Sequence, residues 1–230
     1  MVYYAYIKQS TTDWSYRYLA AFSSRAVADE WWRVLSTSTK YGNTMKRITP
    51  QFFTHDVGKA NAASSTAAGD VAADFMNKVI FTLLYDKGDH IWSVMPTSDF
   101  TDHVSGNSFF IRSKACPDEY WYCPLRDGDH SVYTSRTERT RFRVHIIDGT
   151  PGTIMIGSDL IAITLTTVDL SVRSDPHSGG LFVSKSSEPG LKFSDFLHGF
   201  SVGSTLYKDA KSTDRKAIFK TRTGEEWELV

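Results

Sequence analysis

The chain has 230 residues, of which 41% are hydrophobic and 13% aromatic, so it can bury a core without a metal or a disulfide framework. Lysine and arginine together number 26, as do aspartate and glutamate, so no net charge draws the protein to phosphate backbones or to anionic lipid. We therefore expect neither nucleic acid nor a membrane among its partners.

The N-terminal residues lack the charged, apolar and small-residue order of a signal peptide, and the longest apolar stretch, 79–84, is far shorter than the roughly 20 residues of a membrane span. The chain has two cysteines, Cys116 and Cys123, and no N-x-[ST] sequon. These features predict a cytoplasmic protein with two free thiols. The spacing of the cysteines would also allow a disulfide across a turn in an oxidising compartment.

The first half of the sequence alternates strand and helix patterns. Residues 2–9 and 17–23 predict an antiparallel hairpin around the turn at 11–16, and a further strand is predicted around 45–53, interrupted by Pro50. Between the hairpin and this further strand, Ser24 is placed to cap a helix. The apolar residues of that helix fall on one face, namely Val27, Trp31, Val34 and Leu35.

A second helix is predicted after a flexible connection. Residues 58–69 are small and polar, a composition typical of a mobile loop. Asp70 is placed to cap the helix that follows, whose apolar residues recur at every fourth position: Val71, Phe75, Val79 and Leu83. Residues 1–86 are therefore predicted to form an α/β region with one hairpin and two helices.

Residues 87–230 are predicted to form an all-β domain, which makes the whole chain α+β. Three segments superpose as strand, polar turn and strand: 130–147, 180–197 and 217–230. Each follows another strand, at 120–123, 169–172 and 205–208. Three repeats, with about twelve strands in about 140 residues, favour a β-trefoil over a propeller or a solenoid. The tripeptide GDH recurs at 88–90 and 128–130, each time before a strand. This recurrence could mark a fourth copy of the strand pattern, which would instead favour another barrel or a sandwich.

The repeated pattern in residues 88–230 resembles the β-trefoil proteins of mushrooms, meaning the cytosolic lectins and the cysteine-protease inhibitors called mycocypins. The resemblance implies a binding protein rather than an enzyme. The Gln-x-Trp signature of ricin-type trefoil lectins is absent, so the resemblance assigns no sugar site.

No motif predicts a catalytic centre. Residues 199–203 have the G-x-S-x-G form of a hydrolase nucleophile elbow, but a strand and a loop are predicted after Ser201 in place of the required helix, and no histidine follows it. The seven histidines lack the spacing of a zinc site, and neither common phosphate-binding loop is present. We therefore predict no metal and no cofactor, and we favour binding over catalysis.

The candidate ligand-binding residues lie in or beside the polar loops at 126–130, 174–180 and 209–215. Carboxylates and histidines suit sugar hydroxyls, and an aromatic ring suits the C–H face of a sugar. The predicted residues are Asp127, Asp129, His130, Asp175, His177, Trp121 and Tyr122. The alternative is that Asp, Gly, Pro and Ser simply form good turns, which accounts for the loop composition on its own.

Three functional hypotheses follow. The first is a cytoplasmic lectin-like protein that recognises a glycan or another small polar ligand through hairpin loops. The second is a protease inhibitor of the mycocypin type, whose exposed loops enter the cleft of a protease. The third is an enzyme whose site lies in the cleft between the two halves of the chain.

Overall fold

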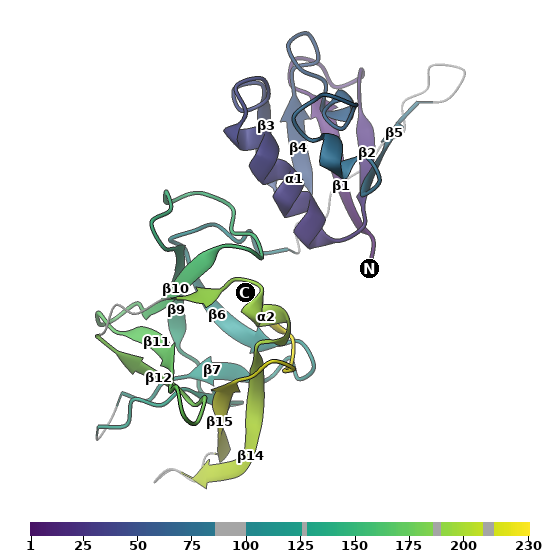
Figure 1. Cartoon of the computed structure of the whole chain (residues 1–230). Coiled ribbons are helices and arrows are strands. Elements are labelled where there is room, and N and C mark those ends of the chain that lie inside the picture. Colours follow the sequence, from purple (N-terminus) through teal and green to yellow (C-terminus); the bar gives the residue numbers. More distant parts are fainter. Residues whose placement is uncertain (86–99, 126–127, 186–189, 209–213) are drawn as a thin grey trace. The chain divides into compact units, whose positions relative to one another are not determined.

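The structure is a computed structural model that describes residues 1–85, 100–125, 128–185, 190–208 and 214–230. These residues are mostly β, with curled sheets (Figure 1). They divide into two compact units, Met1–Asp102 and His103–Val230. The predicted domain boundary between 86 and 87 lies outside the described residues, as does the first GDH tripeptide.

The first unit is a sheet of five strands in the order β3-β4-β1-β2-β5, with α1 against one face (Figure 1). Strands β1 and β4 are parallel, and the other neighbours are antiparallel. The elements are β1 (Tyr3–Gln9), β2 (Tyr18–Phe22), α1 (Arg25–Thr37), β3 (Met45–Thr49), β4 (Phe52–His55) and β5 (Val79–Leu83), with two 3₁₀ turns at Ala62–Ser64 and Ala73–Phe75. The N-terminal hairpin is confirmed, and the strand expected around 45–53 is two strands separated at Pro50.

The helix α1 begins where the sequence predicts. The Ser24 hydroxyl accepts a hydrogen bond from the Val27 amide, which satisfies one of the free N–H groups of the first turn. Trp31 and Leu35 are wholly buried in the core, whereas Trp32 is half-buried at the edge of the apolar face. The Trp31 indole N–H donates to the Ser65 hydroxyl at 3.1 Å and so ties the helix to the 58–69 segment.

The prediction that residues 58–69 form a mobile loop is wrong. Asn61 caps a 3₁₀ turn, and Ala62 is wholly buried. His55 fixes the segment to the sheet, because its Nδ1 accepts from the Ala62 amide at 3.1 Å and its Nε2 lies 2.9 Å from the Tyr16 carbonyl oxygen. Since Nδ1 accepts, Nε2 carries the proton and donates. The small side chains let this segment pack closely, whereas composition alone indicated a linker.

The second predicted helix is also wrong, because residues 79–83 form β5. This strand pairs with β2 in antiparallel register, from Val79 opposite Phe22 to Leu83 opposite Tyr18. A spacing of four residues brings side chains to one face of a helix and equally to one face of a strand, so the pattern fits both structures. The β-branched and aromatic residues at 79–81 favour the strand, and β2 offers the hydrogen-bonding edge.

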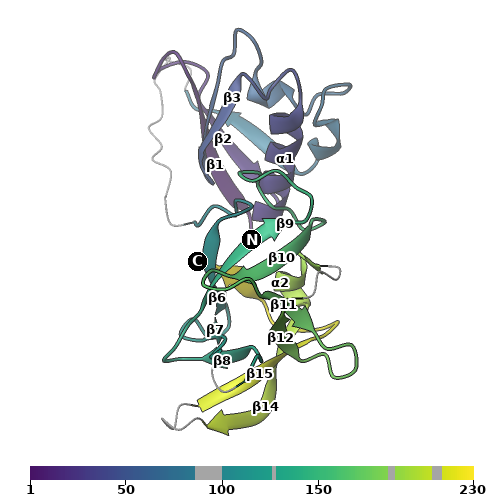
Figure 2. The same ribbon diagram turned by 90° about the vertical axis from the view of Figure 1, so that its left-hand side faces the viewer.

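The second unit is a connected β array (Figure 2), which we divide in chain order into three groups of strands called lobes. The first lobe contains β6 (Ser108–Ser113), β7 (Tyr120–Tyr122), β8 (Tyr133–Ser135) and β9 (Arg141–Ile146). The second contains β10 (Leu160–Leu165), β11 (Ser171–Ser174), β12 (Leu181–Ser184) and β13 (Leu191–Lys192). The third contains β14 (Phe200–Lys208), β15 (Asp214–Lys220) and β16 (Trp227–Leu229), preceded by the short helix α2 (Asp195–His198).

The first two lobes share the same strand pairings. The first strand pairs with the fourth, as β6 with β9 and β10 with β13, and the second and third strands pair with each other, as β7 with β8 and β11 with β12. The third lobe departs from this pattern, because β14 pairs with β15 on both sides of a register irregularity between Val202 and Leu206. A single bridge joins Phe200 to Glu225, just before β16. The segments 130–147, 180–197 and 217–230 each supply a third and a fourth strand.

Further pairings join the lobes. Strand β9 pairs with β10, and the last strand, β16, pairs with the first, β6. At this closure Phe110 and Val230 exchange both backbone hydrogen bonds, at 2.8 and 2.9 Å. The third strands also meet, since β15 pairs with β8, Phe182 of β12 forms a single bridge to Ser131, and Gly180, just before β12, forms one to Phe219 of β15.

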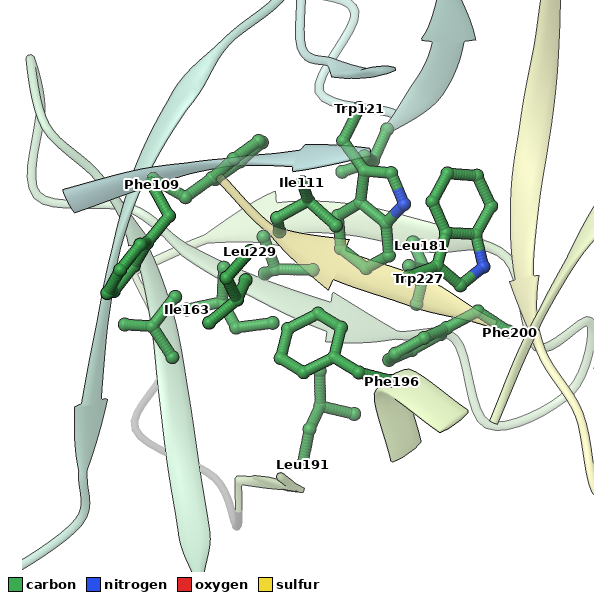
Figure 3. Close-up of a cluster of buried hydrophobic side chains, with 14 of the residues drawn as sticks. Phe109, Ile111, Trp121, Ile163, Leu181, Leu191, Phe196, Phe200, Trp227 and Leu229 are labelled. Atoms are coloured by element: carbon green, nitrogen blue, oxygen red, sulfur yellow. The ribbon is translucent and has the colours of Figure 1, made fainter. Parts of the chain in front are cut away.

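One hydrophobic core fills the second unit, and Trp121 lies within it (Figure 3). The Trp121 ring centroid is 5.0 Å from that of Phe200, 5.8 Å from that of Trp227 and 6.1 Å from that of Phe196. These rings come from the first and third lobes and from α2. The core therefore joins parts of the chain that are remote in sequence.

Replacing Trp121 tests this core. We expect Trp121→Ala to lower the free energy of unfolding of the second unit by about 3–5 kcal/mol, because the cavity loses the contacts of a large buried ring. Urea denaturation followed by circular dichroism measures it. Trp14→Ala is the control, since that side chain is 69% exposed and its loss should change stability little. Unchanged stability in Trp121→Ala would contradict the core role.

The buried imidazole of His55 makes the stability of the first unit depend on pH. Burial lowers the pKa of His55, so the folded chain holds the ring neutral where the unfolded chain begins to take up a proton. The free energy of unfolding should therefore be unaffected above the ordinary histidine pKa of about 6.5 and should fall as the pH drops below it.

Urea titrations of the whole chain between about pH 7 and pH 5 measure this slope. His55→Gln should flatten it, and His177→Gln, at an exposed histidine in the second unit, should not. An equal slope in wild type and His55→Gln would show that another group is responsible.

Candidate functional site

The two aromatic residues predicted to face a ligand are core residues instead. Trp121 is wholly buried and Tyr122 is only 9% exposed. The prediction that they form a sugar-stacking surface is therefore wrong. Trp121 fills the centre of the core, and the Arg215 guanidinium carbon lies 4.6 Å from the centre of the Tyr122 ring. The predicted Asp127 lies outside the described residues.

Asp129 braces the turn that leads into β8. Its carboxylate accepts hydrogen bonds from the Ser131 amide at 2.9 Å and from the Tyr133 hydroxyl at 3.0 Å. The side chain of His130 is exposed, and its backbone carbonyl accepts from the Val183 amide of β12. The hydrogen bonds of Asp129 are those of a turn-forming residue, which is the alternative that the loop composition offered.

Asp175 braces the turn between β11 and β12. Its Oδ1 accepts from the Ser178 amide at 2.7 Å, from the Ser178 hydroxyl at 2.9 Å and from the His177 amide at 3.0 Å. These donors, the Ser178 amide first, lower the pKa of Asp175 because they favour the charged carboxylate. Gly179 has a φ of 76°, and a Cβ there would lie 2.9 Å from the Lys220 carbonyl oxygen. The turn is thus held in one conformation, with His177 exposed.

A surface hollow of about 250 Å³, which we call the turn hollow, lies beside this turn. It is lined by residues of β11, the turn, β12, β13 and β15, namely Val172, Arg173, Ser174, Pro176, Phe182, Leu191 and Lys220. Val172 and Leu191 belong to the core, so part of the lining is apolar. The Lys220 ammonium lies 3.4 Å from an Asp195 carboxylate oxygen, which adds an ion pair at the hollow.

The lining of the turn hollow suits noncovalent binding of a small polar molecule. Arg173 and Lys220 carry hydrogen-bond donors, Ser174 carries a hydroxyl that is both donor and acceptor, and Phe182 supplies an aromatic ring. Its volume of about 250 Å³ lies just below the range for small-molecule sites, which is about 300–1,000 Å³. The sequence prediction missed Arg173, Phe182 and Lys220, because they lie on strands outside the polar loops. Only the fold brings them to the predicted loop at 174–180.

Among the described residues no group of three or more His, Cys, Asp or Glu side chains is placed to hold a metal ion. Ser201 of the G-x-S-x-G sequence lies inside β14, so its surroundings are not those of a nucleophile elbow. Cys116 and Cys123 are free thiols, as predicted. Burial raises the pKa of Cys123 to about 11, which disfavours the nucleophilic thiolate. No helix in the described part of the chain is long and apolar enough to cross a membrane.

Comparison with protein families, with curated proteins and with solved structures gives no match to this chain. The resemblance to mushroom β-trefoil proteins therefore remains a prediction from the repeated strand pattern.

The two thiols should differ in reactivity. At about pH 8, iodoacetamide should alkylate Cys116 far faster than Cys123, because Cys123 is buried and its pKa is raised while Cys116 is half-buried. Mass spectrometry of the intact chain should show one rapid addition, which Cys116→Ser abolishes and Cys123→Ser leaves in place. Rapid labelling of Cys123 in the folded chain would contradict its placement in the core.

Proposed function

We propose that the second unit is a cytoplasmic binding module of the β-trefoil type, which recognises a glycan or another small polar ligand at the turn hollow. The observation that carries the proposal is the hollow itself, where a braced turn, an aromatic ring and several hydrogen-bonding side chains converge. The module requires no cofactor.

The trefoil assignment rests on the strand pairings that the lobes share. Each lobe contains a hairpin, and the outer strands pair with each other in the first two lobes, whereas in the third a single bridge joins Phe200 to Glu225. The three hairpins meet near Val132, Leu181 and Ile218, which are buried and come one from each lobe. The Val132 amide donates to the Leu181 carbonyl, and the Ile218 amide donates to the Val132 carbonyl. This arrangement supports a pseudo-threefold axis through the hairpins.

The chemistry of the turn hollow supports a hydroxyl-rich ligand. A sugar offers an apolar C–H face, which suits the Phe182 ring, and hydroxyl groups that accept from Arg173 and Lys220. The braced turn lowers the entropic cost of binding because it is already fixed. The sequence placed the ligand on Asp175 and His177; in the proposal Asp175 shapes the turn and the strand residues bind.

A glycan array on the purified chain tests the proposal. Phe182→Ala and Lys220→Gln should each weaken binding about tenfold, because each removes one direct contact. His130→Ala is the matched control, since His130 is an exposed loop histidine that does not line the hollow. Circular dichroism confirms that the variants fold. Binding to no glycan, or equal binding by all variants, would contradict the proposal.

One observation favours a second candidate, protease inhibition of the mycocypin type. The 175–178 turn is braced, and its residues Pro176 and His177 are exposed, as a loop that enters a protease cleft requires. Saturable loss of cysteine-protease activity at equimolar chain, abolished by His177→Ala and retained in Phe182→Ala, would favour this function over glycan binding. No inhibition at a large excess of chain would exclude it for the protease tested.

A further inference from the structure

The sheet of the first unit has one face that α1 does not cover. Strand β1 buries Tyr3, Ala5 and Ile7 in the core with α1, so its alternate residues, Tyr4, Tyr6 and Lys8, point to the opposite face. We call this opposite side the open face. Tyr4 is 51% exposed on this face. Tyr4 lies opposite Ala21 of β2, which lies opposite Ile80 of β5, and Ile80 is 69% exposed. Exposed apolar side chains gathered on one face indicate a binding surface.

Two aromatic rings stack on the open face. Tyr6 and Phe52 lie opposite each other on the parallel strands β1 and β4, with ring centroids 5.7 Å apart and ring planes 15° apart. The Arg17 side chain donates from Nε to the Tyr6 hydroxyl, and its guanidinium carbon lies 5.5 Å from the ring centre. Tyr6 is thereby buried and fixed, whereas Phe52 is only half-buried.

Phe52 lines a broad hollow of about 520 Å³ in which positive charge exceeds negative charge. Three lysines line this lysine hollow, Lys8, Lys46 and Lys59, against one carboxylate, Asp56. Lys59 pairs with Asp56 at 3.1 Å, and Lys8 pairs with Asp13 outside the hollow. The remaining lining is mostly neutral and polar, including threonine, serine and asparagine side chains.

The register of the strands places lysines and aromatic rings in adjacent rows. Lys46 of β3 and Lys8 of β1 lie on either side of Thr54 of β4. Phe52 and Tyr6 occupy the next row, two residues along the same strands, which is a distance of about 7 Å. The stacked rings of Tyr6 and Phe52 therefore lie in the row next to the two lysines.

We propose that the open face binds single-stranded nucleic acid, with bases stacked on Phe52 and Tyr4 and phosphates beside Lys8 and Lys46. Unpaired bases have free π-faces that stack on aromatic side chains, and a groove of positive charge follows the backbone. The equal numbers of charges in the whole chain led us to expect no nucleic acid. The local arrangement is different, because the lysines are gathered beside the rings. An acidic peptide would use the lysines and leave the rings unoccupied.

Fluorescence anisotropy with labelled oligonucleotides of about ten nucleotides tests the proposal on the full chain at low salt. Single-stranded RNA and DNA should bind more than tenfold tighter than a duplex of the same sequence, because paired bases cannot reach the rings. A preference for RNA would add recognition of the 2′-hydroxyl, and equal binding would show that only bases and phosphates are read. Affinity should fall as salt rises.

Single substitutions measure separately what the aromatic row and the lysine row contribute to binding. Phe52→Leu should weaken single-strand binding about tenfold with an unchanged salt dependence, because it removes stacking alone. Lys46→Gln should weaken binding and reduce the slope of log affinity against log salt by about 0.7, the value for one lost contact to a single strand. Lys78→Gln is the matched control, an exposed lysine of the same unit that does not line the hollow. It should bind as the wild type does.

Three results would overturn the proposal. The first is the absence of binding to either single strand, and the second is equal affinity for single strand and duplex. The third is an equal loss of binding in Lys46→Gln and Lys78→Gln. Displacement of the oligonucleotide by polyglutamate that is equally strong for wild type and Phe52→Leu would assign the face to acidic peptides instead. Because Lys46 is exposed, its variant keeps the test valid if a Phe52 variant fails to fold.

Discussion

The pairing of the first and last strands of the second unit, β6 with β16, is the constraint on which its three lobes depend. The pairing closes the array over more than a hundred residues, at a large cost in chain entropy. The partly exposed ion pair of Arg112 with Glu228, at 2.6 Å, contributes little. Burial of Ile111 and Leu229 in the core offsets the cost, since both side chains face inward from this pair of strands.

Pairing between lobes also sets where the proposed binding residues lie. The turn hollow takes its lining from β11, β12, β13 and β15, strands of two lobes that are joined by the bridge of Gly180 to Phe219 and by the hydrogen bond from the Lys220 amide to the Gly179 carbonyl. Asp175 and Gly179 fix the turn beside it, so its shape is set before a ligand arrives. In the first unit the sheet positions the proposed binding residues, because the register of β1, β3 and β4 places aromatic rings beside lysines. Both proposed sites therefore lie on regular strands.

Local signals in the sequence predicted local structure well. The cap at Ser24, the N-terminal hairpin and the strand positions of the repeat all depend on neighbouring residues, and the structure contains them. The helix predicted at 70–83 failed because a four-residue period fits a strand as well as a helix. The aromatic residue Trp121 was assigned to a ligand because sequence does not show which face of a short strand is buried. Lys220 and Phe182 gave no signal, since only tertiary pairing brings them together.

Amide hydrogen exchange followed residue by residue by NMR tests the closure most directly. The amides of Phe110 and Lys114 donate across it to the carbonyls of Val230 and Glu226, which flank β16, and the Ile218 amide donates to Val132 between the hairpins. If the three lobes close as one cooperative structure, all three amides should exchange only through unfolding of the whole unit and give the same free energy. Exchange of Phe110 and Lys114 at much lower free energy than Ile218 would contradict the closed array.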